Sequence, residues 1–369
     1  MKPSRPETGL EGYRDKIMAE KRILIIGGGL AGWRAAEAAV DCGASVTLVA
    51  NGDGNSPHIH ALNCPVLPED SVELYTEDTL RSGRYGGDRS LVETMCRESV
   101  ALASEFEFDA TVIRPLGCSV PRAVSIRHAI GAIALAQIRE RIKDNVKVER
   151  RTVTPEEVSA LRAADALLAI IIATGGWCGK YEFSDNPSYL KGDGLAIAEA
   201  LGAAVRDVDE EHVQYEPTVR TEGPMRGVPV ITTLLHEGGK LLTPEGNEFL
   251  EDARLNKDEL SKAIFSIGGT AIYDLRDVPE EKLLECNMNP AERVIKVAPA
   301  PHSSLGGIVI DTKCHALDAE GNIVPHLYAC GEVTAGVHGL NRLGGNGGTA
   351  AMVFGSIAGR QAAHELERQ

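Results

Sequence analysis

The residues best suited to chemistry gather between Gly331 and Gly348, near the carboxyl end of the chain. This stretch holds His338, Asn341 and Arg342 among seven glycines. Because glycines lack a Cβ atom, backbone N–H groups can approach a flat or anionic ligand, and the helix that follows presents its N-terminus to the same place. An arginine in such a loop can bind a carboxylate through two parallel hydrogen bonds. A glycine-rich turn with a solvated arginine is the alternative for this stretch taken alone.

The elements that must position such a site begin with RILIIGGGLAGWRAAEAAVDCGASVTLVA. Its apolar runs and alanine spacing predict a strand at 22–26, a helix at 33–42 and a second strand at 45–50. Gly27, Gly29 and Gly32 between them fit the G-x-G-x-x-G pattern of dinucleotide-binding βαβ units. In that pattern Gly27 permits the turn, Gly29 lets the pyrophosphate approach, and Gly32 lets the helix pack on the strand.

The acidic residue that usually binds the ribose hydroxyls is missing from the end of the second strand, where Ala50 stands. Asn51 and Asp53 follow directly, and either could substitute, or backbone and water could hold the ribose. A later strand ends in ATGG, which includes Thr174 and Gly175. Asp193 in Gly-Asp-Gly then opens a further helix.

These stretches together resemble one known family. GEV-x(4)-HG-x-NRLGGN, GDGLAIAEALGAAVRDVDEEHVQYEPT and PAPHSSLGGIVID are similar to segments of the flavoprotein subunits of succinate dehydrogenase and fumarate reductase, and of L-aspartate oxidase. The resemblance covers nearly all of the chain from Lys21. It implies an α/β fold: a Rossmann-like FAD-binding domain (21–211 and 301–369), an inserted smaller α+β cap domain (212–300) and an N-terminal arm (1–20).

The resemblance implies FAD as cofactor. In addition to the residues above, it assigns cofactor binding to Gly307, Glu332, Leu343, Gly345 and Asn346. Some members of the family attach FAD covalently to a histidine, and His58 and His60 lie near that place. The surrounding pattern differs here, so we expect non-covalent FAD.

For the substrate, the resemblance assigns carboxylate binding to Arg342 and His302. It also assigns substrate contacts to Thr218, Glu237 and His338. Lys257 stands where the family has a proton-donating arginine, and Arg254 is an alternative donor. Glu216 replaces a substrate-contacting histidine, which predicts that fumarate and succinate are poor substrates because two carboxylates repel. Alternatively, Glu216 and Lys257 pair with each other and contact no substrate.

Composition narrows the remaining possibilities. A formal net charge of −15 argues against nucleic acid or an anionic membrane as partner. No run of eighteen apolar residues exists, and the eight scattered cysteines indicate free thiols and no metal site, so we expect a soluble cytoplasmic protein. We expect an FAD-dependent oxidoreductase acting on a small carboxylate or amino acid, with an electron-carrier protein as a possible partner. An electron-transferring or assembly subunit without substrate chemistry is the alternative, and the oligomeric state stays open.

Overall fold

The computed structural model describes residues 22–105, 111–115, 117–125, 129–250 and 255–368. Its centre is a six-stranded sheet in the order β14-β15-β7-β1-β2-β6, in which β14 alone is antiparallel to its neighbour. The strands are β1 (Arg22–Ile26), β2 (Ser45–Ala50), β6 (Val146–Arg150), β7 (Ala169–Ile172), β14 (His315–Leu317) and β15 (Ile323–Ala329). β7 is buried along its whole length, as expected for a central parallel strand with both faces covered.

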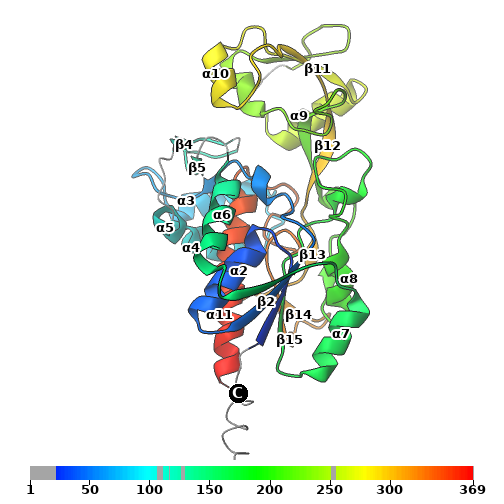
Figure 1. Ribbon diagram of the computed structural model, residues 1–369. Helices are drawn as coiled ribbons and strands as arrows, with labels where there is room; N and C mark the ends of the chain where they lie inside the picture. The colour runs from blue at the N-terminus through cyan, green and yellow to red at the C-terminus, as the bar shows by residue number, and fades with distance from the viewer. Residues whose placement is uncertain (1–21, 106–110, 116, 126–128, 251–254, 369) are drawn as a thin grey trace, which may run out of the picture.

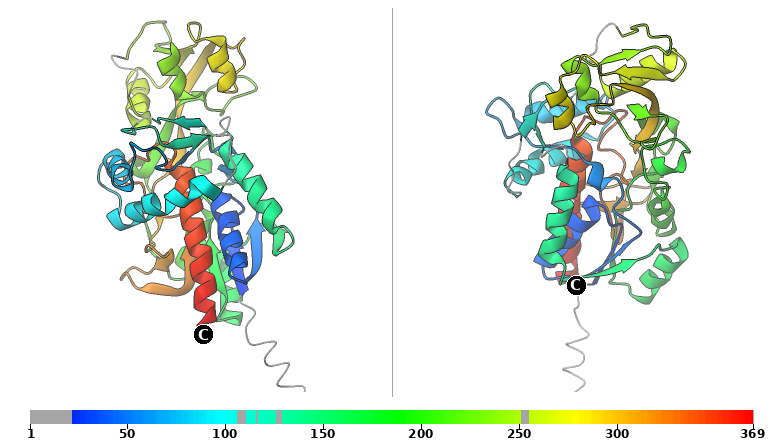
Figure 2. Two further views of the ribbon diagram at one scale, coloured as in Figure 1. Left: turned by 90° about the vertical axis from the view of Figure 1, so that its left-hand side faces the viewer. Right: turned by 45° about the horizontal axis from the view of Figure 1, so that its top comes forward.

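Helices cover both faces of this sheet (Figures 1 and 2). One side carries α2 (Leu30–Asp41), α6 (Ile130–Ile142) and the long α11 (Asn346–Glu367), and the other carries α7 (Pro155–Ala164) and α8 (Asp193–Ala200). α11 packs along α2 at Gly355 and Gly359, where a Cβ atom would lie 2.6 Å and 2.1 Å from backbone oxygens of α2. The alanines and glycines of these two helices therefore permit close contact.

Shorter elements complete this part of the molecule, which we call the base. They are α3 (Val72–Ser82), α4 (Arg89–Glu98) and α5 (Leu102–Glu105), a small sheet of β3 (Leu62–Asn63), β4 (Thr111–Ile113) and β5 (Ala123–Ser125), and the pair β8 (Val205–Arg206) and β13 (Gly307–Ile308). Within the described residues, every helix is too short or too polar to span a bilayer.

A second sheet, in the order β10-β11-β12-β9, forms the part that we call the cap. It comprises β9 (Val213–Arg220), β10 (Lys240–Leu242), β11 (Ala271–Asp274) and β12 (Val294–Ser304), with helices α9 (Lys257–Ser266) and α10 (Glu280–Glu285). The cap has its own buried core, which includes Leu234, Ile264, Tyr273 and Val297. β9 and β12 run side by side from the base into the cap, so this antiparallel pair joins the two parts.

The α/β fold predicted from the sequence is confirmed. The strands predicted at 22–26 and 45–50 have those bounds, and the predicted helix at 33–42 begins three residues earlier, at Leu30. The sequence predicts a β-hairpin that turns at 320–322 and places His315 on its surface, which is wrong, because His315 is only 3% exposed. Its ring lies between the carboxylates of Asp311 and Glu365, which stabilise it in the interior.

Candidate active site

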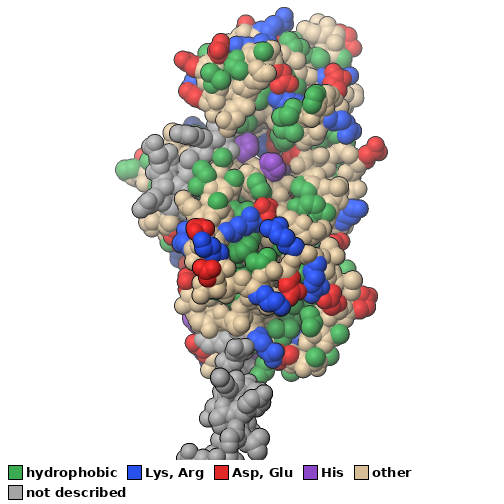
Figure 3. Space-filling model, in the orientation of Figure 1, with side chains coloured by type: hydrophobic (Ala, Val, Ile, Leu, Met, Phe, Trp, Pro, Cys, Tyr) green, Lys and Arg blue, Asp and Glu red, His purple; other side chains and the backbone are tan. Residues whose placement is uncertain are grey.

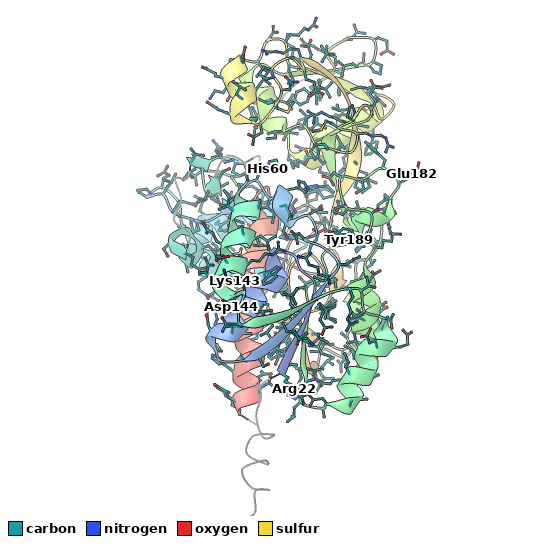
Figure 4. All side chains as sticks on the ribbon, in the orientation of Figure 1. Arg22, His60, Lys143, Asp144, Glu182 and Tyr189 are labelled. Atoms are coloured by element: carbon teal, nitrogen blue, oxygen red, sulfur yellow. The ribbon has the colours of Figure 1, made fainter. Side chains whose placement is uncertain are left out.

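One cavity of about 630 Å³ runs from the carboxyl edge of the central sheet to the inner face of the cap. Chain segments that directly follow β1, β2, β7 and β15 all line it, because the carboxyl ends of parallel strands meet at one edge. Figure 3 shows the surface hollowed between base and cap, and Figure 4 shows that His60 lies at this opening. Arg22, at the start of β1, lies at the far end of the base (Figure 4).

Glycines shape the dinucleotide end of the cavity. Gly27 has φ +126°, and a Cβ atom there would lie 2.1 Å from the carbonyl oxygen of Ala173. A Cβ atom on Gly32 would lie 2.0 Å from the carbonyl oxygen of Gly27, so this glycine serves helix packing and does not line the cavity. Gly29 precedes the first residue of α2, whose N-terminus therefore faces the cavity and favours a pyrophosphate.

At the end of β2, Ala50 and Asn51 line the cavity. The carboxylate of Asp53 pairs with Arg139, whose Nη2 also donates to the Gly28 carbonyl at 3.3 Å. Asp53 is therefore already engaged, and the Asn51 side chain is the more available of the two alternatives. Tyr189 accepts a hydrogen bond from Gly54 N–H at 3.0 Å and covers this loop (Figure 4).

Several buried polar atoms along the cavity have no hydrogen-bond partner among the described residues. They are Thr174 Oγ1, Gln214 Oε1, His338 Nδ1 and Arg342 Nε. Buried polar groups are normally paired, so unpaired atoms lining a cavity indicate a polar ligand. Together with the glycine-lined dinucleotide end, they fit a bound FAD.

Glu332 follows β15 and faces the same space. Its Oε1 accepts hydrogen bonds from Ser304 N–H at 3.0 Å and from Ser304 Oγ at 3.2 Å. Burial raises the pKa of this carboxyl group, and the two hydrogen bonds from Ser304 oppose the shift. Gly175, Asp193 and Gly345, which were predicted to bind the cofactor, also line the cavity.

Arg342 lies at the substrate end within a chain of hydrogen bonds. Its Nη2 donates to His302 Nε2 at 3.0 Å and to Ser303 Oγ at 3.2 Å, and His302 Nδ1 lies 2.6 Å from Asp185 Oδ2. Because a guanidinium only donates, Nε2 is the acceptor, and Nδ1 carries the proton that binds Asp185. These two contacts fix the orientation of the imidazole, which holds the guanidinium in place.

The carboxylates that offset the positive charge of Arg342 do not form a direct ion pair with it. Burial lowers the pKa of its guanidinium, and the carboxylates of Glu332, Glu216 and Asp185 oppose that shift. No described carboxylate lies within 4.0 Å of it. Burial and the charge of Arg342 lower the pKa of His338 to about 3, so His338 is a neutral hydrogen-bonding group.

Glu216 and Lys257 meet on the cap side of the cavity. They form an ion pair between β9 and the first turn of α9, with side-chain exposures of 5% and 29%. Both line the cavity. The Glu216–Lys257 ion pair that the sequence offered as an alternative is therefore present. Both residues nevertheless line the cavity, where a ligand can contact them.

Other predicted site residues lie outside the cavity lining. Thr218 Oγ1 donates to the Val230 carbonyl at 2.7 Å, and Glu237 is exposed on the cap. Gly307 permits a close backbone approach to Val333, where a Cβ atom would lie 2.0 Å from the carbonyl oxygen. Arg254 lies outside the described residues.

Two predicted cofactor residues build the loop instead of lining the cavity. Leu343 is buried, with its Cδ1 2.9 Å from the place of a Cβ atom on Gly117. Asn346 is fully buried at the first turn of α11, where Oδ1 accepts from Asn63 Nδ2 at 2.6 Å and from the Tyr75 hydroxyl at 2.7 Å. Both hold the glycine-rich loop in shape.

Sequence reasoning missed Asp185 and Gln214. Asp185 is 117 residues from its partner His302. Gln214 Nε2 donates to Asn341 Oδ1 at 2.8 Å and to the Arg342 carbonyl at 2.9 Å. The polar loop SDNPSY between the ATGG strand end and Gly-Asp-Gly was the one available signal for Asp185.

The family model described as "FAD binding domain" matches residues 22–141 and 122–347. The chain belongs to this family. It is 31% identical over 403 residues to one subunit of the fumarate reductase (CoM/CoB) of Methanothermobacter marburgensis, covering 92% of this chain and 72% of that protein. It is also 31% identical over 370 residues to an L-aspartate oxidase of Saccharolobus solfataricus, covering 90% and 75%.

The fold agrees with that membership. The open conformation of a flavocytochrome c3 fumarate reductase matches with a TM-score of 0.73 at 23% identity, covering 99% of this chain and 83% of that one. The protein is thus an FAD-dependent oxidoreductase of the fumarate reductase and L-aspartate oxidase family, as the sequence predicted. This finding favours an enzyme over a subunit that lacks substrate chemistry. In the described part of the chain, no group of three metal-ligating side chains is placed to hold a metal ion.

Proposed function

We propose that this oxidoreductase transfers a hydride between FAD and a carbon atom of a small monocarboxylate. The observation that supports this most directly is Arg342. It is held by His302, its Nε is unpaired among the described residues, and no described carboxylate neutralises it at short range. A guanidinium with free N–H groups in a shielded cavity is suited to bind one carboxylate through two parallel hydrogen bonds.

The chain's own residues would divide the work as follows. Arg342 binds the carboxylate, and the Asp185–His302 hydrogen bond fixes its orientation. Bound FAD would accept the hydride from the substrate carbon or donate it to that carbon. When a carbon–carbon double bond is reduced, one carbon receives the hydride and the other needs a proton, which the Lys257 ammonium, paired with Glu216, can donate.

The ion pair also bears on which carboxylate binds. The charges of Glu216 and Lys257 offset each other, so the cap offers no excess positive charge at this place to a second carboxylate. Fumarate and succinate are therefore proposed to be poor substrates. A substrate amine or hydroxyl that hydrogen-bonds to Glu216 is the second possibility, as in the oxidation of an amino acid.

We also propose non-covalent FAD, an electron-carrier protein as redox partner, and a cytoplasmic location. Eight cysteines, none of them in a disulfide among the described residues, support the location, because thiols persist in reducing compartments. Acid precipitation tests the attachment: the flavin should remain in the supernatant. Flavin retained in the pellet would point to His58 or His60, which both line the cavity.

An anaerobic stopped-flow screen tests the function. Oxidised and reduced protein are mixed with monocarboxylates, dicarboxylates and amino acids, and flavin absorbance is followed. At least one monocarboxylate should change the flavin redox state, and Arg342→Ala should retain FAD but lose this reaction by orders of magnitude. His302→Ala should have a milder effect. Equal rates in wild type and Arg342→Ala, or no reaction across the panel, would contradict the proposal.

A further inference from the structure

The cap contributes a wall of apolar and sulfur-containing side chains to the cavity that contains Arg342. Its members, which we call the apolar wall, are Met225, Val228, Pro229, Val230, Ile231, Cys286 and Met288. Met225 is 48% exposed and Val228 is 40% exposed, so both remain accessible. Exposed apolar side chains that line a concave site mark a surface for an apolar group of a ligand.

Three backbone carbonyls of this wall already accept hydrogen bonds from other cap residues. Arg220 donates to the carbonyls of Val228 and Pro229, at 3.4 Å and 3.2 Å from Nη1, and Thr218 Oγ1 donates to the Val230 carbonyl at 2.7 Å. These carbonyls are therefore satisfied, and the exposed side chain of Val228 lines the cavity, whereas the side chain of Val230 is buried in the cap core. Thr218 thus supports the backbone of the wall, although it does not line the cavity itself.

The charge of Arg220 is likewise used within the cap. Its Nη2 lies 3.0 Å from Glu292 Oε2, and its guanidinium is 5% exposed. Lys257 pairs with Glu216. Neither Arg220 nor Lys257 is therefore free to bind a second carboxylate. The cap offers the rest of the substrate the apolar wall and the neutral polar residues Thr232, Thr233, Asn256 and Asn287.

One strand, β9, contacts both the carboxylate site and the wall. Gln214 contacts Arg342 at the base end of β9, and Thr218, four residues further along the same strand, contacts the wall at Val230. We propose that the substrates are monocarboxylates with an apolar alkyl or aryl tail, which lies on the apolar wall while Arg342 holds the carboxylate. This inference rests on the proposed function, because Arg342 must bind the carboxylate.

Isothermal titration calorimetry on the FAD-loaded protein tests the tail site without relying on turnover. Saturated acids from propionate to octanoate are titrated, with succinate and an amino acid for comparison. Each methylene buried on the wall should lower Kd about fourfold until the wall is filled. Tighter binding of succinate or of the amino acid than of octanoate would overturn the inference.

Two exposed residues allow a matched test. Met225→Ser and Val228→Ser together should lower the ratio of the propionate Kd to the octanoate Kd about tenfold. Leu284→Ser is the control, since Leu284 is an exposed apolar cap residue, at 56%, outside the cavity lining. It should leave the ratio unchanged, and an equal fall in the control would contradict the inference.

The two levels of the proposal fail in different ways. If the acids bind through Arg342, as judged by loss of heat in Arg342→Ala, but Kd is independent of chain length, the apolar tail is refuted and the proposed function stands. If no acid binds, or Arg342→Ala binds as well as wild type, the carboxylate site itself is refuted, and the tail site with it.

Discussion

The ion pair between Glu216 and Lys257 makes a prediction that can be worked from charge and burial. Glu216→Gln removes the carboxylate and leaves the Lys257 ammonium beside the cavity with its charge unneutralised. A second carboxylate at ~4 Å would then gain about 4 kcal/mol at an effective dielectric constant of ~20. Because Lys257 is 29% exposed, solvent screens part of this, and we expect about 1–3 kcal/mol.

That energy corresponds to roughly a tenfold to hundredfold rise in kcat/KM for fumarate. Turnover of crotonate, which has a single carboxylate, should change much less, and the ratio of the two is the measured quantity. Anaerobic fumarate reduction with a reduced dye as electron donor provides the assay. The double variant Glu216→His with Lys257→Arg should also raise fumarate turnover. Brisk fumarate reduction by the wild type, or a fumarate-to-crotonate ratio unchanged by Glu216→Gln, would refute the reasoning.

Two further predictions concern the cofactor and stability. Gly27→Ala should yield protein with little bound flavin, measured by flavin absorbance per chain, because the added Cβ atom would overlap the Ala173 carbonyl. Gly43→Ala is the control, because Gly43 also has a positive φ but has open space around its Cβ position. Burial opposes the charge of His315, but its hydrogen bonds to Asp311 and Glu365 raise its pKa, whereas both carboxyl pKa values are lowered. The protonated His315 ring therefore stabilises the folded protein most below pH 6.5, the pKa of histidine in the unfolded chain. This stabilisation is lost as the pH rises through the higher pKa that His315 has in the folded protein. The carboxylate contribution is full above about 4.5 and is lost in acid. His315→Gln should therefore cost most stability near pH ~5.5, about 1–3 kcal/mol by urea unfolding, and a cost that increases towards alkaline pH would contradict this.

Local patterns in the chain were sufficient for the nucleotide-binding half of the protein. Strand, glycine turn, helix and second strand are encoded within thirty residues, so the roles of Gly27, Gly29 and Gly32 follow from backbone sterics alone. The glycine-rich loop around Arg342 was recognisable for the same reason. FAD and the family followed from these patterns together, and the match to the FAD-binding family confirms both.

Contacts between distant segments were decided only by the tertiary structure. Asp185 and His302 are 117 residues apart, and Glu216 and Lys257 are 41 apart, so no local pattern reports that either pair meets. The burial of a side chain also depends on distant segments. The sequence around His315 is typical of a surface hairpin, but Glu365 of α11 contacts its ring. The boundaries at 211/212 and 300/301 stay a prediction.

Family resemblance also cannot tell a residue that lines the cavity from one that shapes it. Leu343 and Asn346 share the loop with Arg342, but their side chains turn into the base, where packing against Gly117 and hydrogen bonds from Asn63 hold them. The sequence by itself determined the cofactor, because the motifs that carry the family resemblance are local, and it predicted a carboxylate-binding role for Arg342. The tertiary structure decided which charges are already paired and which surfaces remain open, because both depend on how the cap lies against the base.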